Sequence, residues 1–550
     1  LTRSLSTRLP SLTQITVAAA ARIQSWISSI CCEGRSLPVT NLTKLSTIGA
    51  VLLFMTASAC SESDSSRPGD SSTSAGAYAS NDLDDAAYYE ITIPADDHRV
   101  AFVSASLTPN EREFYMFPGA NQFPKRWAKF VSDFQIQDED GEPIPFSESD
   151  DGTWQLSSMP QGRISFSYRV SVDHEDHTWS GGVDGAAYWR EWGVFFTARS
   201  LFVVNGDERE NITVELRLPN QWQVTVPWQR QDADTTRFAV PNHDVLATSM
   251  FFAGTHKEVS VRQGPFEFLL ALGGEEVLAQ EDEFVSMAGG VLDYYVDLMG
   301  DVPRLQSQDA AGTPVVIINQ AEMTDGEALG NNISILLEPS SDQMSQHIAR
   351  LIFAHEFFHL WNGKSFWPSG DDCEWFKEGF TNYYTLKALH HIGYLSDESY
   401  LELLAGFFYR RYDSDDAVGR LSITNGDLKH EHWGLIYSGG MLVAIAQDLQ
   451  IRSATGNEKS LDDLMRFLFD EHSDVAYDLG DIENTLSDLN NASQEDFFGR
   501  YVHGVERIPI SQFLALADIE TAEDGGQTVF KIREDSDQDS SEIRRGLFSD

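Results

Sequence analysis

Cysteine and basic residues are both scarce in this chain. Only four of its 550 residues are cysteine, and three of them, Cys31, Cys32 and Cys60, lie within the first 60 positions. A fold held together by several disulfides is therefore excluded. Lysine and arginine number 39 against 85 aspartates and glutamates, which gives a formal net charge of -46. So many carboxylates repel phosphate backbones and anionic lipid surfaces, so nucleic acid is not expected as a partner.

Apolar residues are plentiful enough to build folded cores. Hydrophobic residues make up 41% of the chain and aromatic residues 11%, which argues against general disorder. A chain of 550 residues is too long for one compact core. We therefore expect roughly two to four domains.

The first 60 residues have the pattern of a targeting segment. Lys44 precedes a short apolar run, Ile48–Met55, and then small residues that end at Cys60. Cys60 after Ala-Ser-Ala resembles the lipidation site of a bacterial lipoprotein, and an ordinary signal peptide is the alternative. We expect an exported, membrane-anchored lipoprotein facing the periplasm or exterior, with Cys60 as its one membrane contact. Residues 1–43 fit neither pattern, and an over-extended reading frame and a transit peptide both stay open.

The pattern of the chain changes several times after the targeting segment. Residues 61–85 are acidic, small and polar, as in a flexible tether. Alternation such as Ile164–Val170 predicts an antiparallel β-sandwich, whereas later runs predict strands at Val315–Ile318 and Ile333–Leu337. The expected parts are a β domain over 86–255, a mixed domain over 256–395, an α-helical domain over 396–517 and a loose acidic tail over 518–550.

A His-Glu-x-x-His motif begins at His355. No proline or glycine interrupts residues 340–362, so a helix over about Asp342–Trp361 is allowed. On that helix His355 and His359 project from one face, where both imidazoles reach one zinc ion. Glu356 is rotated by about 100° and faces a water molecule rather than the metal. By itself the motif also fits two histidines without a metal.

A third ligand is expected from a second helix, about Glu374–His391. Eighteen residues separate His359 from Glu378, and Glu378 stands in an aromatic-Lys-Glu-Gly context. This distance and context resemble those of gluzincin peptidases. Asn382, one turn later, is a candidate to orient a ligand, or a plain surface residue.

The residues 355–364 and 375–384 look like the glycyl aminopeptidase family of gluzincin zinc metallopeptidases, and the similarity extends over about residues 86–515. The resemblance implies a thermolysin-like zinc peptidase domain over 256–395. It also implies that Tyr437, before a Gly-Gly pair and an apolar helix, donates to the oxyanion; a packed core tyrosine is the alternative. No PDZ domain is expected after residue 516.

One part of the family pattern is altered. Where the family carries a Gly-Gly-Leu-Glu-His-like strip thought to receive the substrate's amine, this chain has Gly326–Asn332. Glu327, Asn331 and Asn332 are the candidate substrate contacts in this strip.

The sequence thus predicts a multidomain α+β zinc peptidase, most simply an aminopeptidase acting on a peptide or protein substrate. Two alternatives stay open: an endopeptidase of the same fold, and a catalytically inactive, surface-anchored binding protein.

Overall fold

The structure is a computed structural model that describes most of the chain after residue 85. The described residues are 86–121, 123–173, 185–206, 209–233, 235–305, 312–339, 343–534 and 538–548, and they belong to one compact unit, Leu53–Asp550. The predicted targeting segment, the tether and the lipid site at Cys60 lie outside them. Within the described part of the chain, no helix combines the length and apolar character needed to cross a membrane.

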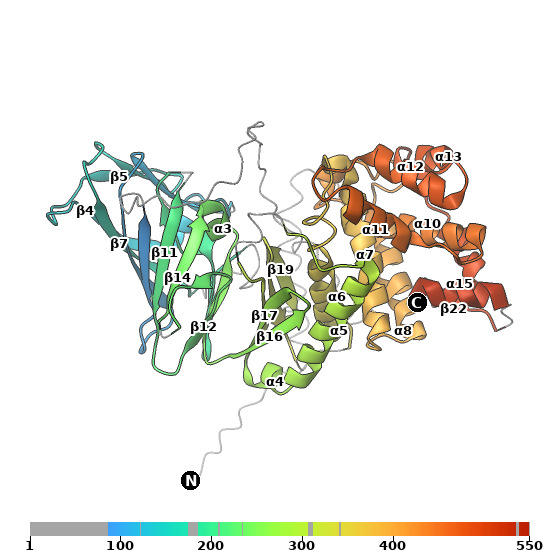
Figure 1. The fold of residues 1–550 in the computed structure, drawn as a ribbon, viewed down its shortest axis with the longest axis horizontal. Helices are drawn as coiled ribbons and strands as arrows, with labels where there is room; N and C mark the ends of the chain where they lie inside the picture. The colour runs from blue at the N-terminus through green and yellow to red at the C-terminus, as the bar shows by residue number, and fades with distance from the viewer. Residues whose placement is uncertain are drawn as a thin grey trace, which may run out of the picture. The chain divides into compact units, whose positions relative to one another are not determined.

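A seven-stranded sheet begins the described chain (Figure 1). In spatial order its strands are β13 (Gln229–Arg230), β14 (Arg237–Asn242), β11 (Glu210–Arg217), β1 (Ala87–Thr92), β2 (Val100–Leu107), β7 (Ile164–Ser171) and β4 (Val131–Gln137). The strands β1 and β11 pair in parallel, and the other neighbours pair antiparallel. Along β7 the buried residues Ile164, Phe166, Tyr168 and Val170 alternate with exposed ones, as in a strand with one face on a core.

Two smaller sheets contribute to the same core. One contains β10 (Val203–Val204), β3 (Glu113–Met116), β6 (Trp154–Leu156) and β5 (Phe146–Glu148); the other contains β12 (Gln223–Thr225), β15 (Met250–Gly254), β9 (Gly193–Thr197) and β8 (Tyr188–Arg190). A short helix, α3 (His243–Ala247), begins where the Asn242 side chain accepts from the Val245 N–H.

The strands β9 and β15 are buried on both faces because they lie between two cores. Phe196 and Phe251 stack with ring centroids 5.3 Å apart inside the N-terminal core. Phe195 and Phe252 alternate to the other face and pack against the next sheet. The sheet-rich region is thus joined to the following domain by apolar contact.

The second core is built on a five-stranded sheet with helices beside it (Figure 1). Its strands in order are β16 (Lys257–Gln263), β17 (Phe266–Gly273), β18 (Val315–Gln320), β20 (Asn332–Leu337) and β19 (Asp325–Leu329). The three central strands pair in parallel, and β16 and β19 are antiparallel edges. The helices that follow these strands are α4 (Glu275–Leu278), α5 (Glu281–Met299), α6 (Gln343–Phe358) and α7 (Glu374–His391).

The last third of the chain is mainly helical. Its helices are α8 (Asp397–Leu403), α9 (Arg410–Ser414), α10 (Gly439–Thr455), α11 (Leu461–Glu471), α12 (Leu479–Asn490), α13 (Glu495–Phe497) and α14 (Ile510–Leu514). Three π-helical segments interrupt this series, at Leu404–Tyr409, Gly434–Ser438 and Phe498–Val502. The expected multidomain α+β class is confirmed, with strands first and helices last, while the thermolysin-like detail stays a prediction.

The expected loose tail over 518–550 is wrong for the residues described there. They form a hairpin of β21 (Ile519–Asp524) and β22 (Gln527–Ile532), followed by a helix, α15 (Gln538–Phe548). Leu547 and Phe548 are buried, and Lys387 on α7 donates to the Gly546 carbonyl at 2.8 Å. A few apolar side chains on one helix face outweigh the acidic composition on which the prediction rested.

Candidate metal centre

The helix α6 carries the His-Glu-x-x-His motif and is held from two sides. The Tyr295 hydroxyl on α5 donates to the Ala354 carbonyl at 2.9 Å, one residue before His355. Phe357 packs against Phe268 of β17, with ring centroids 4.8 Å apart. Because both contacts are buried, the face that carries His355 and His359 has a defined orientation.

The second histidine is oriented by the loop after α6. His359 lies directly after the last residue of α6, and its Nδ1 lies 2.8 Å from the Asn362 carbonyl oxygen. A carbonyl only accepts, so Nδ1–H donates and Nε2 keeps its lone pair. The Asn362 side chain donates in turn to the Lys377 carbonyl at 3.0 Å, which ties the loop to α7.

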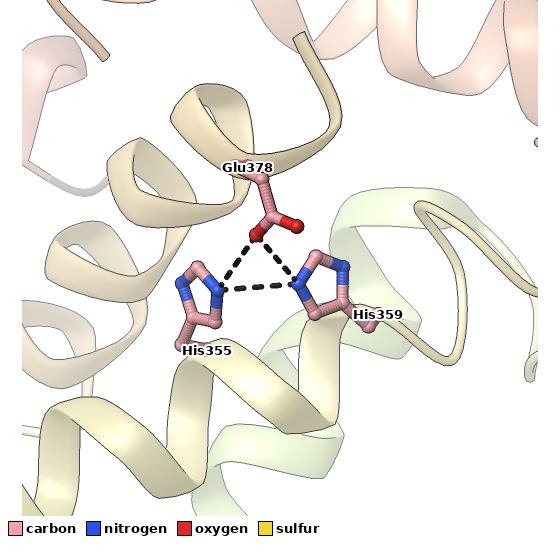
Figure 2. Close-up of side chains that lie close together, drawn as sticks. All are labelled: His355, His359 and Glu378. Carbon is pink, nitrogen blue, oxygen red and sulfur yellow. Dashed lines mark hydrogen bonds and ion pairs between the residues drawn. The ribbon is translucent and has the colours of Figure 1, made fainter. Parts of the chain in front are cut away.

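The helix α7 brings Glu378 to these two imidazoles (Figure 2). The Oε2 atom of Glu378 lies 3.3 Å from His355 Nε2 and 3.2 Å from His359 Nε2, and the two Nε2 atoms are 3.1 Å apart. The Glu378 side chain is fully buried, and both histidines are nearly so. The three side chains that the sequence singled out as ligands therefore meet at one point.

The donor set fits a tetrahedral metal ion. Three lone-pair atoms that face one another repel unless a proton or a cation lies between them. A tetrahedron whose centre lies 2.0–2.1 Å from each corner has edges of about 3.3–3.4 Å, close to the three separations of 3.1–3.3 Å. Two imidazoles and one carboxylate are also the ligand set of many catalytic zinc sites.

The charges of Glu378 and His359 depend on the charged groups around them. Burial alone would raise the pKa of Glu378, but Lys429 and His359 outweigh it and hold that pKa well below the usual range. Burial alone would lower the pKa of His359, yet the Glu378 carboxylate raises it above the ordinary value. The Glu378 carboxylate is therefore held ionised even though its side chain is fully buried.

The predicted base, Glu356, lies beside the three candidate ligands without joining them. It is 8% exposed, and its charge contributes to the raised pKa of His359. The position agrees with the rotation expected one residue after His355 on α6.

Tyr437 also lies beside the ligands, on the π-helical segment Gly434–Ser438. Its ring centroid is 6.3 Å from that of His355, and Trp433 stacks on it at 5.0 Å with an interplanar angle of 8°. Single π-helical turns inside helices are frequent at functional sites. Asp415 anchors this segment, because its carboxylate accepts from the Leu435 N–H at 3.0 Å.

Two glycines allow α7 and α10 to approach closely at the same place. A Cβ atom on Gly379 would overlap the backbone of Gly440, and a Cβ atom on Gly440 would overlap the Trp375 carbonyl oxygen. Since Gly379 follows Glu378 and Gly440 lies three residues after Tyr437, this contact sets the distance between the metal-ligand helix and Tyr437.

The altered strip lies on the edge strand β19 and the turn after it. A Cβ atom on Gly326 would overlap Ile352 of α6, so this strand runs along the helix one turn before His355. Glu327 Oε2 accepts from the Gly185 N–H at 2.7 Å, and Asn331 lies in the turn before β20. Asn332 accepts from the Val315 N–H at 3.2 Å and donates to the Thr248 carbonyl at 2.9 Å, which joins β20 to the sheet-rich region.

Sequence reasoning placed Asn382 near the ligands, and it lies buried on α7 one turn after Glu378. It missed Asn362, Lys429, Glu374 and Trp433. Asn362 had a signal, since it follows the histidine motif by three residues. Nothing in the local pattern marks Lys429, which reaches Glu378 from 51 residues further along the chain.

A second group of possible ligands, Asp415, Asp416 and His432, lies beside the π-helical segment. The Asp415 carboxylate is already engaged by the Ala417 and Leu435 N–H groups and by His432 Nδ1. These contacts account for the group as an anchor of the backbone.

Parts of the chain match the models of a known peptidase family. The Peptidase M61 N-terminal domain matches residues 89–255, and the M61 glycyl aminopeptidase matches residues 349–438. Among solved structures, the chain is similar to an aminopeptidase N family protein from Idiomarina loihiensis, at 17% identity and a TM-score of 0.65, over 82% of each chain. At that identity the likeness shows a shared fold. A search of curated proteins found no match.

Proposed function

Because the chain belongs to the M61 glycyl aminopeptidase family, and so to a family of peptidases, we propose that it is a zinc-dependent aminopeptidase. The observation that carries the proposal is the convergence of His355, His359 and Glu378, whose three facing atoms are spaced like the corners of a zinc tetrahedron. When bound, zinc activates water near neutral pH and polarises a carbonyl group.

Two side chains beside the ligands supply the rest of the proposed chemistry. Glu356 accepts a proton from the attacking water and passes it to the leaving amine. Tyr437 donates a hydrogen bond to the carbonyl oxygen as negative charge develops on it. The low exposure of Glu356 and the position of Tyr437 beside His355 support these roles.

Replacing Glu356 by glutamine tests the proposal. Glu356→Gln keeps the shape and removes the base, so we expect unchanged zinc content and a kcat lower by about 10²–10⁴-fold. His355→Ala is the matched control, which should lose metal and turnover together. Full turnover in Glu356→Gln would refute the assignment.

Recognition of a free amine distinguishes an aminopeptidase from an endopeptidase. Glu327 on β19 is the proposed amine acceptor, and its Oε2 also accepts from the Gly185 N–H at 2.7 Å, which orients the carboxylate. Hydrolysis of a peptide should therefore be compared with that of its N-acetylated form. An aminopeptidase cleaves only the free peptide at its first bond, and faster cleavage of the blocked peptide would establish the endopeptidase.

We also propose that the protein is exported and anchored through a lipid on Cys60. The support is the sequence pattern alone: an apolar run followed by small residues before the cysteine. Cys60→Ser should move the protein from the membrane fraction to the soluble fraction, and an unchanged distribution would contradict the anchor.

A further inference from the structure

The two oxygens of Glu378 face different partners. Oε2 faces both imidazoles, at 3.3 and 3.2 Å. Oε1 faces away from them and accepts from Lys429 Nζ at 3.3 Å, with Lys377 Nζ at 3.8 Å. The carboxylate is therefore divided between a metal-facing oxygen and an ammonium-facing oxygen.

Lys429 is itself held firmly behind Glu378. Its Nζ donates to Glu374 Oε2 at 2.5 Å, while Lys377 pairs with the other oxygen of Glu374 at 3.0 Å. All four side chains are buried, with exposed fractions of 10% for Lys429, 4% for Lys377, 9% for Glu374 and none for Glu378. Buried charges persist only when they are paired, and here two ammonium groups offset two carboxylates.

The backbone before Lys429 is also fixed. The short turn Gly426–Leu428 packs against the segment that precedes α7, and a side chain on Gly426 would overlap the Asp371 carbonyl oxygen. The Lys429 Nζ donates to Glu374 Oε2 and to Glu378 Oε1, so the position of this group is fixed by both carboxylates.

We propose that Lys429 is a positioning residue that keeps Glu378 in one-oxygen ligation by occupying Oε1, so that Oε2 alone faces the metal. The inference rests on the metal site of the proposed function. Without the Lys429 ammonium, Oε1 keeps only the more distant Lys377 Nζ at 3.8 Å, so the carboxylate can rotate about its terminal bond and present either oxygen, or both, to the ion. Residues that orient a metal ligand through a hydrogen bond typically contribute about 10–100-fold to metal affinity.

The test is the zinc affinity of the purified full chain, measured by competition with a chelator and independent of hydrolysis. Lys429→Met should weaken zinc binding by about 10–100-fold, and Lys429→Arg, which keeps a cationic donor, should lose less. Lys387→Met is the matched control. Lys387 on α7 is also buried, but it donates to the Gly546 carbonyl, so its loss should lower Tm and leave zinc affinity unchanged.

Two results would overturn the inference. Unchanged affinity in Lys429→Met would show a purely structural role, and tighter binding would show that the ammonium only repels the ion. If Lys429→Met does not fold, Glu374→Gln releases Lys429 from its second partner without touching Glu378, and a smaller loss in the same direction is expected. A wild type that binds one zinc ion but hydrolyses no peptide would refute the proposed function and leave this test valid.

Discussion

Two buried histidines differ in charge between the sheet-rich region and the candidate metal centre. His256 lies between β15 and β16, and His359 lies at the end of α6; both are less than one-tenth exposed. Burial lowers the pKa of His256 to about 4, whereas the Glu378 carboxylate raises that of His359. The ring of His256 meets the Thr225 hydroxyl at 2.7 Å, while His359 meets a buried carboxylate.

Burial by itself therefore does not decide the charge of a side chain. In the sheet-rich region, ion pairs such as Glu215 with Arg237 lie at the surface, where they contribute at most about 1 kcal/mol. At the metal centre, four charged side chains are withdrawn from water and depend on one another. The centre therefore carries an electrostatic cost that these surface pairs avoid.

The largest effect is expected from removing the carboxylate of Glu378, which contacts both the histidines and Lys429. Glu378→Gln leaves Lys429 with one partner fewer, so we expect unfolding in the presence of chelator to require about 3–5 kcal/mol less. Zinc affinity should fall by at least about 100-fold, since a ligand is lost as well. Chemical denaturation and chelator competition measure the two effects.

Glu215→Gln is the control for this experiment. Its carboxylate accepts from Arg237 on the solvated sheet, so the expected loss is below about 1 kcal/mol. Equal losses in the two variants would contradict the contrast between the regions.

Because His256 is neutral in the folded protein, we expect the protein to lose stability in acid. Below pH about 6.5 the unfolded chain protonates His256, but the folded chain does so only near pH 4. Stability from this group is thus complete above pH about 6.5 and is lost, by about 3 kcal/mol, as the pH falls toward 4.

His256→Gln cannot ionise and should lack this acid loss. The free energy of unfolding of the wild type should approach that of the variant as the pH falls, when both are measured in denaturant titrations. Parallel pH profiles for the two proteins would contradict a neutral His256.

The last prediction concerns the contact between α7 and α10. Gly440→Ala places a methyl group against the Trp375 carbonyl, so stability should fall by about 1–3 kcal/mol. Hydrolysis should fall further than zinc affinity, because Tyr437 moves relative to the ligands. Gly499→Ala is the control: it lies in another π-helical segment, with no atom near its added methyl group. Equal losses of kcat in both variants would contradict the role given to this contact.

Much of the centre was predictable because its main signals are local. The spacing of His355 and His359 needs only a helix, and the predicted span Glu374–His391 has the same bounds as α7. The family resemblance supplied Glu378 and Tyr437. The expected tail was wrong because composition averages over residues, whereas docking of α15 depends on Leu547 and Phe548.

By itself, the sequence determined the order of strands and helices and the helical pair of histidines, since each depends on neighbours within a few residues. It also determined the acidic character of the chain, which is a sum over its residues. The tertiary structure alone decided that Lys429 stands behind Glu378, that the Asn362 side chain reaches the Lys377 carbonyl of α7 and that two glycines bring α7 and α10 together. These contacts join residues far apart along the chain, and only the folded packing of whole helices determines which of them meet.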